Sequence, residues 1–266
     1  MLAFIAMFCL GALLALVLAI ASRRFEVKTD PKVDMVVEAL PGVNCGGCGY
    51  AGCTAYAEAV VNNGADATLC APGGAKAGMA IAGILGISAV NKVRSVSLCH
   101  CQKKDVKTVA LYTGIQTCRG AALFGLGGGW LDCRYGCLGY GDCVNVCPFG
   151  AVTMGGDGRP VVDESLCTGC KKCAVACPRG LMIVTPIDKY IHVRCHNSDR
   201  GPRANKICAR ACIACRKCEK VCPAGAIGVP NYLAELDYNK CVGCGKCVEV
   251  CPHQVIADLR SARSRS

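Results

Sequence analysis

Aromatic residues are scarce in this sequence. They make up 5% of the 266 residues and include a single Trp, which argues against a large hydrophobic core. The 32 glycines follow no G-X-Y period, which excludes a collagen-like chain, and an apolar content of 53% excludes a wholly disordered one. Cysteine, in contrast, is present in large excess, with 26 residues. The role of these cysteines is therefore the main question that the sequence poses.

The first 22 residues carry no charge, and Arg23 and Arg24 follow directly. An apolar run of this length can cross a hydrocarbon layer of roughly 30 Å as one helix. A cleaved secretory signal, the alternative, would begin with basic residues and have a shorter apolar run. Because Lys and Arg mark the cytoplasmic side, we expect a single-pass transmembrane helix over 1–22 in the cytoplasmic membrane, with the soluble domains facing the cytoplasm.

A cytoplasmic location changes the chemistry expected of the cysteines. Disulfides are rare there, so dense cysteine at regular spacing indicates metal binding. Residues 23–40 are expected to form a linker and an amphipathic helix that begins near Asp30-Pro31. Residues 41–98 contain a C-x2-C-x4-C-x16-C run rich in glycine, which predicts one [4Fe–4S] cluster, with zinc as the alternative. The cysteines of this run are Cys45, Cys48, Cys53 and Cys70.

Two later stretches of the chain repeat each other. The segment that begins at Cys133 aligns without gaps with the segment that begins at Cys208, and each is followed by a second cysteine run. We therefore expect two tandem units of bacterial-ferredoxin type, 99–190 and 191–258, and a disordered tail over 259–266. The predicted fold is α+β, with a transmembrane helix, a small 4Fe–4S domain and these two units.

Three of the four runs in the repeat have the spacing C-x2-C-x2-C-x3-C-P of two-cluster ferredoxins, in which the fourth cysteine binds the other cluster. This crossed pattern predicts three ligand sets. They are Cys147 with Cys167, Cys170 and Cys173; Cys251 with Cys212, Cys215 and Cys218; and Cys222 with Cys241, Cys244 and Cys247. In the fourth run Tyr140 stands at a cysteine position, so we expect Cys133 to complete a set with Cys137, Cys143 and Cys177.

Five sets of four leave six of the 26 cysteines: Cys9, Cys99, Cys101, Cys118, Cys195 and Cys208. Cys9 lies in the predicted membrane helix. A sixth cluster is a hypothesis, because the others would otherwise be oxidation-prone thiols. Its ligands would be Cys101, Cys118, Cys195 and Cys208, with Cys99 as a substitute for Cys101. The alternative is a set of reduced structural thiols.

The net charge of +11 agrees with this interpretation. Each all-thiolate [4Fe–4S]²⁺ cluster adds about −2, so the basic excess is mainly counter-charge rather than a nucleic-acid footprint. The chain contains no nucleophile motif and no phosphate-binding loop. We therefore expect no organic cofactor and no complete active site in this chain.

The motif LPGVNCGGCGYAGCTAYAEAV…CAPGG, behind an apolar segment that ends in ASRRF, resembles the B subunits of Rnf electron-transport complexes. The stretches YTGIQTCRGAALFG, RYGCLGYGDCVNVCPFGAV and NYLAELDYNKCVGCGKCVEVCP resemble the longer, cluster-rich form of that subunit. The resemblance implies an iron–sulfur relay subunit of a membrane ferredoxin:NAD oxidoreductase that couples electron transfer to Na⁺ or H⁺ translocation. Soluble ferredoxin and the other subunits of the complex would be its partners, and flavins and nicotinamide would belong to those subunits.

Two other functions remain open at this point. One is a membrane polyferredoxin that feeds another reductase, and the other is a membrane iron–sulfur redox sensor. A sensor needs one labile cluster rather than a series of clusters, which favours a relay.

Overall fold

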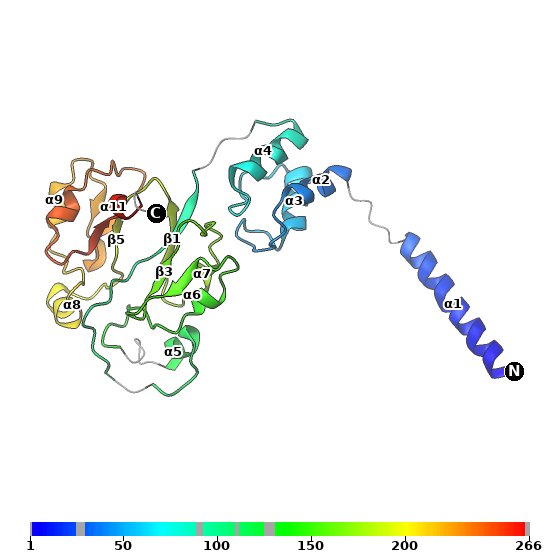
Figure 1. The fold of residues 1–266 in the computed structure, drawn as a ribbon, viewed down its shortest axis with the longest axis horizontal. Helices are drawn as coiled ribbons and strands as arrows, with labels where there is room; N and C mark the ends of the chain where they lie inside the picture. Colours follow the sequence, from blue (N-terminus) through cyan, green and yellow to red (C-terminus); the bar gives the residue numbers. More distant parts are fainter. Residues whose placement is uncertain (1, 25–29, 89–92, 110–111, 125–130, 264–266) are drawn as a thin grey trace.

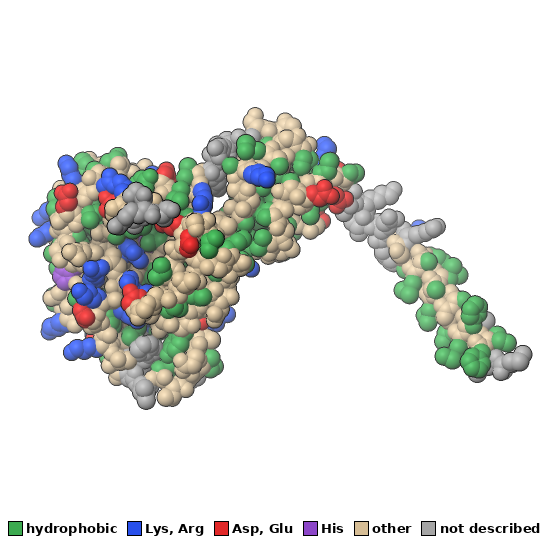
Figure 2. Space-filling model, in the orientation of Figure 1, with side chains coloured by type: hydrophobic (Ala, Val, Ile, Leu, Met, Phe, Trp, Pro, Cys, Tyr) green, Lys and Arg blue, Asp and Glu red, His purple; other side chains and the backbone are tan. Residues whose placement is uncertain are grey.

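The computed structural model describes residues 2–24, 30–88, 93–109, 112–124 and 131–263 (Figure 1). Helix α1 spans Leu2–Arg24, and hydrophobic side chains cover its surface, among them Phe4, Phe8 and Leu18 (Figure 2). Of the helices that the structure describes, none combines the length and hydrophobicity that a membrane crossing requires. The transmembrane helix over 1–22 stays a prediction, and residues 25–29 of the predicted linker lie outside the described residues.

Three helices form the small domain that follows: α2 (Pro31–Ala39), α3 (Cys53–Asn63) and α4 (Gly74–Leu85). Helix α2 begins where the sequence predicts, because the Asp30 side chain accepts a hydrogen bond from the Lys32 backbone N–H and Pro31 occupies the first helical position. Its buried face packs against the other two helices. The core of this domain is built mainly from Val33, Val36, Tyr56, Val60 and Ile81.

The first ferredoxin-like unit contains two antiparallel strand pairs. β1 (Ser95–Cys99) pairs with β4 (Met182–Pro186), and β2 (Val152–Met154) pairs with β3 (Pro160–Val162). Because β1 forms its hydrogen bonds with β4, it belongs to this unit, although the sequence places a domain boundary after residue 98. The helices of this unit are α5 (Cys118–Phe124), α6 (Asp142–Asn145) and α7 (Lys172–Ala176).

The second unit repeats this arrangement. β5 (Ile191–Val193) pairs with β8 (Ile256–Asp258), and β6 (Ile227–Gly228) pairs with β7 (Glu235–Leu236). Its helices are α8 (Gly201–Ile207), α9 (Lys217–Val221), α10 (Lys246–Glu249) and the 3₁₀ turn η1 (Pro230–Tyr232). The cores of both units are small and rich in sulfur, since buried cysteines are prominent members of them. Charged side chains gather over these units and are sparse over α2–α4 (Figure 2).

The C-terminal tail is ordered where the structure describes it, which corrects the predicted disorder. Residues 260–263 form the short helix α11 (Arg260–Arg263). The guanidinium of Arg263 forms an ion pair with Glu164, and it also donates to the backbone oxygens of Ile187 and Lys189, each at 2.6 Å. Composition suggested a free tail, whereas these contacts with the first unit hold it in place. Residues 264–266 lie outside the described residues.

Candidate metal centres

The four cysteines that the sequence groups in the small domain are neighbours in the structure. Helix α3 begins at Cys53, whose backbone N–H donates to the Asn44 side-chain oxygen at 2.7 Å. The hydroxyl of Tyr56 donates to the Asp66 oxygen at 2.8 Å and holds the loop that leads to Cys70. Burial raises the pKa of the Cys70 thiol, and the three neighbouring cysteine thiols raise it further. We call Cys45, Cys48, Cys53 and Cys70 group 1.

Group 2 consists of Cys147, Cys167, Cys170 and Cys173, also as predicted. Cys147 and Cys167 share one buried cluster of the first unit. The pKa of the Cys170 thiol is raised by burial and by neighbours that include Cys147. Strand β1 reaches this group, because the Ser97 backbone N–H donates to the sulfur of Cys167 at 3.3 Å. The crossed ligand pattern of two-cluster ferredoxins is therefore matched by the placement of these four residues.

The second unit holds two groups that agree with the predicted sets. Group 5 is Cys212, Cys215, Cys218 and Cys251, which line one hollow. Group 6 is Cys222, Cys241, Cys244 and Cys247, which line another. Apart from these thiols, the hollow of group 6 is lined by Gly, Ala, Val, Ile and Leu residues, with no carboxylate and no imidazole. An all-thiolate donor set in an apolar wall fits a [4Fe–4S] cluster.

The irregular run departs from the prediction. Cys137, Cys143 and Cys177 line one hollow together with Cys118 and Cys99, whereas Cys133 is not among its lining residues. Burial raises the pKa of the Cys143 thiol to about 12, and the thiols of Cys137, Cys118 and Cys177 add to the rise. Asp142 explains the arrangement, since its carboxylate accepts the backbone N–H groups of Cys118 and Arg119 at 2.9 and 3.0 Å. We call Cys118, Cys137, Cys143 and Cys177 group 3.

Cys133 lies instead with the remaining cysteines. Cys101, Cys133, Cys195 and Cys208, which we call group 4, line a fourth hollow between the two units. Cys133 packs there against Ile207 of α8, and the Asn197 amide nitrogen lies 3.8 Å from its sulfur. The predicted sets therefore exchange one member, Cys133 for Cys118. Cysteine spacing could not predict this exchange, because Cys133 is far in the sequence from Cys195 and Cys208, which belong to the second unit.

Two half-buried arginines, Arg179 and Arg194, lie beside groups 3 and 4. Arg179 donates to the Gly136 oxygen at 2.6 Å, and Arg194 donates to the Cys99 oxygen at 3.1 Å. Burial lowers the pKa of both guanidinium groups, and the cysteines nearby oppose that change. Arginine remains charged in proteins, so these residues place fixed positive charge next to the thiols. Such charge suits clusters that carry net negative charge.

Cys99 is a buried thiol outside the six groups. Burial raises its pKa well above the usual range of a thiol, with Cys101 and Cys137 as further causes. Its sulfur lies 3.9 Å from the Cys101 oxygen. The side chain of Cys9 lies outside the described residues.

Among the described residues, no group of three or more His, Cys, Asp or Glu side chains is positioned to hold a single metal ion. A cube spreads its four irons over four corners, so its thiolate ligands stand further apart than the ligands of one Zn²⁺.

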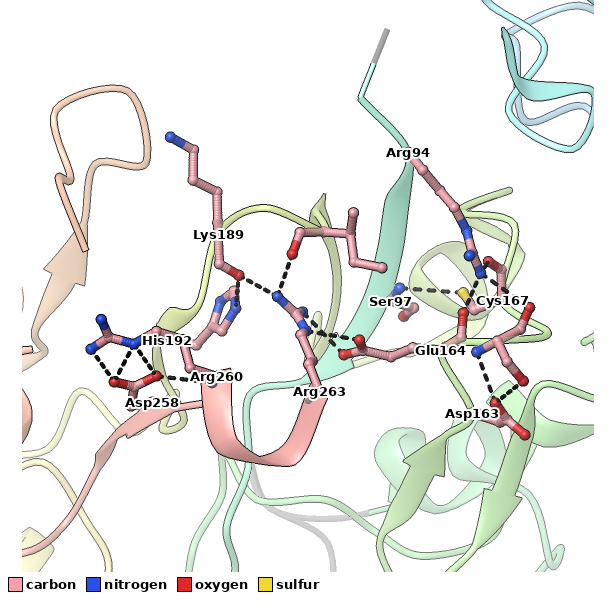
Figure 3. A network of polar contacts seen from close by, with 12 residues as sticks. Arg94, Ser97, Asp163, Glu164, Cys167, Lys189, His192, Asp258, Arg260 and Arg263 are labelled. Atoms are coloured by element: carbon pink, nitrogen blue, oxygen red, sulfur yellow. Dashed lines mark hydrogen bonds and ion pairs between the residues drawn. The ribbon is translucent and has the colours of Figure 1, made fainter. Parts of the chain in front are cut away.

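A polar network joins group 2 to the C-terminal end of the chain (Figure 3). Arg94, just before β1, donates to the backbone oxygens of Glu164, Ser165 and Cys167. The carboxylate of Glu164 in turn pairs with Arg263 of α11. The loop that carries Cys167 is thus held from both sides.

The six groups follow one another through the structure. A Cβ atom on Gly47 would lie 2.6 Å from the Cys170 oxygen, so the group 1 loop packs directly on group 2. Cys173 of group 2 is among the thiols that raise the pKa of Cys143 in group 3, and Cys101 of group 4 is among those that raise the pKa of Cys137. The backbone N–H of Cys212 in group 5 donates to the sulfur of Cys195 in group 4 at 3.4 Å. Groups 5 and 6 share one core.

Comparison with known families defines the class of protein. Residues 40–72 match the FeS family, an Fe–S cluster family, and residues 132–181 and 211–256 each match a 4Fe–4S dicluster domain. The chain is thus an iron–sulfur protein with domains of ferredoxin type.

Three curated relatives extend over most of the chain, and each is named as the B subunit of a complex. The chain is 46% identical to that of the Na⁺-translocating ferredoxin:NAD⁺ oxidoreductase complex of Acetobacterium woodii, over 86% of this chain and 69% of the relative. It is 42% identical to that of the ion-translocating oxidoreductase complex of Methanosarcina acetivorans, over 87% and 88%. It is 40% identical to that of the proton-translocating ferredoxin:NAD⁺ oxidoreductase complex of Clostridium ljungdahlii, over 88% and 82%. The chain belongs to the family of B subunits of ion-translocating oxidoreductase complexes of Rnf type.

Proposed function

We propose that this chain is the iron–sulfur relay subunit of a membrane-bound ferredoxin:NAD oxidoreductase complex that couples electron transfer to ion translocation. One [4Fe–4S] cluster would be held by each of the six cysteine groups. The observation that carries the proposal is the continuous order of these groups, from group 1 through group 6. A series of neighbouring one-electron centres is what a relay requires, whereas a sensor needs only one.

When bound, the clusters would supply one-electron chemistry at low potential. The cysteine thiolates of the chain would hold the cubes, and backbone N–H groups donate hydrogen bonds to their sulfurs. In three of the runs the backbone N–H four residues after the last cysteine donates to its sulfur, which gives Leu181 to Cys177, Ala226 to Cys222 and Val255 to Cys251, at 3.2–3.3 Å. These donors stabilise negative charge on sulfur and so favour electron uptake.

The partners follow from the names of the relatives, which are subunits of complexes that act on ferredoxin and NAD⁺. We assign this chain the contact with soluble ferredoxin. We also propose that residues 1–22 anchor it in the cytoplasmic membrane as one crossing. The uncharged composition of this segment, followed by Arg23 and Arg24, supports that assignment and its orientation.

The relay is tested by anaerobic purification of the tagged chain from membranes, followed by EPR titration with reduced ferredoxin. We expect the other subunits of the complex to copurify, about 24 irons per chain for six cubes of four irons, and reduction of the clusters by ferredoxin. Recovery of the chain alone, or clusters that reduced ferredoxin leaves oxidised, would contradict the proposal. Copurification with an unrelated reductase would instead identify a polyferredoxin.

The anchor is tested separately by deletion of residues 2–22. We expect the truncated chain to appear in the soluble fraction with the same iron content as the full chain. If the truncated chain still sediments with membranes that lack the other subunits, the assignment of residues 1–22 as the anchor is wrong.

A further inference from the structure

Ser97 makes two hydrogen bonds to the cysteines of group 2. It lies on β1 and is 2% exposed. Its backbone N–H donates to the Cys167 sulfur at 3.3 Å, and its hydroxyl oxygen lies 3.1 Å from the Cys173 sulfur. An iron-bound thiolate has no proton to donate, so with a cluster in place the hydroxyl must be the donor. One residue from outside the ferredoxin motif thus stabilises two sulfurs of the same group.

The second unit contains a matched position without a hydroxyl. In the first unit Ser97 pairs with Val184, seven residues after Cys177, the last cysteine of its run. In the second unit Ile191 pairs with Asp258, which is likewise seven residues after the last cysteine, Cys251. The position equivalent to Ser97 is therefore Ile191. Ile191 is 2% exposed and lines the hollow of group 6, the counterpart of group 2 in the repeat.

We propose that Ser97 is a positioning residue that raises the reduction potential of the cluster of group 2 above that of the cluster of group 6. The inference rests on the proposed function, because it requires both groups to hold clusters. Reduction adds one electron to the cube, and much of the added negative charge is shared with its sulfurs. A hydroxyl that donates to a ligand sulfur stabilises the reduced form more than the oxidised form, whereas the side chain of Ile191 offers no donor.

The position of Ser97 is determined by the surrounding backbone. Gly169, at φ +71°, lies so close to β1 that a Cβ atom would meet the Ser95 oxygen at 2.6 Å. The equivalent Gly243 has the same φ but no neighbour within 4 Å. Arg94 adds a direct link, since it donates to the Cys167 oxygen at 2.8 Å (Figure 3). Gly169 therefore brings the cysteine loop into close contact with β1 in the first unit, whereas Gly243 makes no such contact in the second unit.

A higher potential at group 2 would determine which cluster of the relay holds an electron. Group 2 stands between group 1 and group 3. With a raised reduction potential, the cluster of group 2 is reduced early. It then holds an electron while the cluster of group 1 is reduced and reoxidised. The Ser97 hydroxyl, rather than a difference in ligand type, would thus make the reduction potentials of groups 2 and 6 differ although their cysteine spacing is identical.

The test is an EPR-monitored potentiometric titration of the purified chain with its clusters. The signals of groups 2 and 6 are first assigned by their loss in Cys170→Ala and Cys244→Ala. We expect Ser97→Ala to shift the group 2 signal to lower potential and leave the group 6 signal in place. Ser97→Thr keeps a hydroxyl and should restore the potential of the native chain. The reciprocal change, Ile191→Ser, should raise the potential of group 6 alone.

Unchanged potentials in Ser97→Ala and in Ile191→Ser, with full iron content, would overturn this inference and leave the relay intact. Equal shifts in Ser97→Ala and Ser97→Thr would also overturn it, because they would indicate a loss of packing rather than of a donor. If Ser97→Ala fails to fold, Ile191→Ser alone decides the question. Absence of iron from the native chain would overturn the proposed function itself.

Discussion

The two ferredoxin-like units have the same strand pairs but obtain their cysteines differently. In the second unit groups 5 and 6 come entirely from residues 212–251, with regular spacing. In the first unit Tyr140 interrupts one run, and group 3 draws on Cys118 from α5. Cys133 lies instead in group 4, with Cys101 of the first unit and Cys195 and Cys208 of the second. The interrupted run of the first unit is therefore accompanied by a cysteine group that lies between the two units.

In groups 3 and 4, tertiary contacts bring together cysteines that regular spacing brings together elsewhere. In a regular run the loop itself delivers three thiols to one cube. In group 3 the position of Cys118 depends on Asp142, whose carboxylate caps the N-terminus of α5 and places Cys118 beside Cys143. In group 4 the position of Cys133 depends on α8, which packs against this residue. The irregular groups therefore depend on tertiary contacts that regular groups do not need.

The largest effect should follow removal of iron and sulfide. Both units have cores built around buried cysteines, so the chain without clusters should lose the protection of β1, β4, β5 and β8 from hydrogen exchange. The small domain, with Cys70 as its one buried cysteine in an otherwise apolar core, should keep part of its helix. Hydrogen exchange by mass spectrometry before and after chelation measures this. Retention of the native protection of these four strands after full iron loss would contradict the prediction.

Single cysteine variants separate the two irregular groups. Cys118→Ala should remove the cluster of group 3, and Cys133→Ala the cluster of group 4, each with a loss of about four irons and of a different EPR signal. Cys99→Ala is the control, since Cys99 is a buried thiol that lines the hollow of group 3 but is assigned to neither ligand set, and this variant should keep all its iron. Loss of the group 4 signal in Cys118→Ala and of the group 3 signal in Cys133→Ala would instead restore the ligand sets predicted from spacing.

The stability of the second unit should depend on pH through His192, a residue that the first unit replaces with leucine. His192 is fully buried in β5, between the Tyr238 hydroxyl and the Lys189 oxygen, whereas the register puts Leu98 at the same place in the first unit. Burial, and then the charges of Arg263 and Arg194, lower the pKa of His192 to about 4. The unfolded chain takes up this proton near pH 6.5, so stability should be constant above that pH and fall by about 3 kcal/mol toward pH 4.

Urea unfolding of the second unit at pH 7.5 and pH 5 measures this loss. His192→Leu, which installs the residue of the first unit, should abolish the difference that the imidazole causes. A variant that retains the full pH dependence would show that other groups are responsible.

The smallest effect concerns the contact that ties α11 to the first unit. Arg263→Gln removes a largely buried ion pair with Glu164 and two hydrogen bonds to backbone oxygens, and should cost about 2 kcal/mol in thermal unfolding of the first unit. Arg260→Gln removes an exposed pair with Asp258 and should leave that transition unchanged. Equal effects of the two variants would mean that α11 does not stabilise the first unit.

Most of the regular metal chemistry follows from cysteine spacing alone. Spacing predicted groups 1, 2, 5 and 6, because each ligand set of this kind is specified by a loop of a few residues and one cysteine that the crossed pattern supplies. The start of the helix at Asp30-Pro31 was also predictable from a local signal, since a side-chain cap and a proline determine it. Group 3 and group 4 were predicted with one cysteine exchanged, and the order at Arg260–Arg263 was not predicted at all.

The sequence by itself thus determined the family and the ferredoxin type of the domains. It also predicted which cysteines lie together wherever they follow one another at fixed intervals, because short-range spacing limits where a chain can place its thiols. Only the tertiary structure decided which of Cys118 and Cys133 lies in each irregular group, and that Ser97 faces group 2 while Ile191 faces group 6. These outcomes depend on strand register and on helix packing between residues far apart in the chain, and neither leaves a local signal in the sequence.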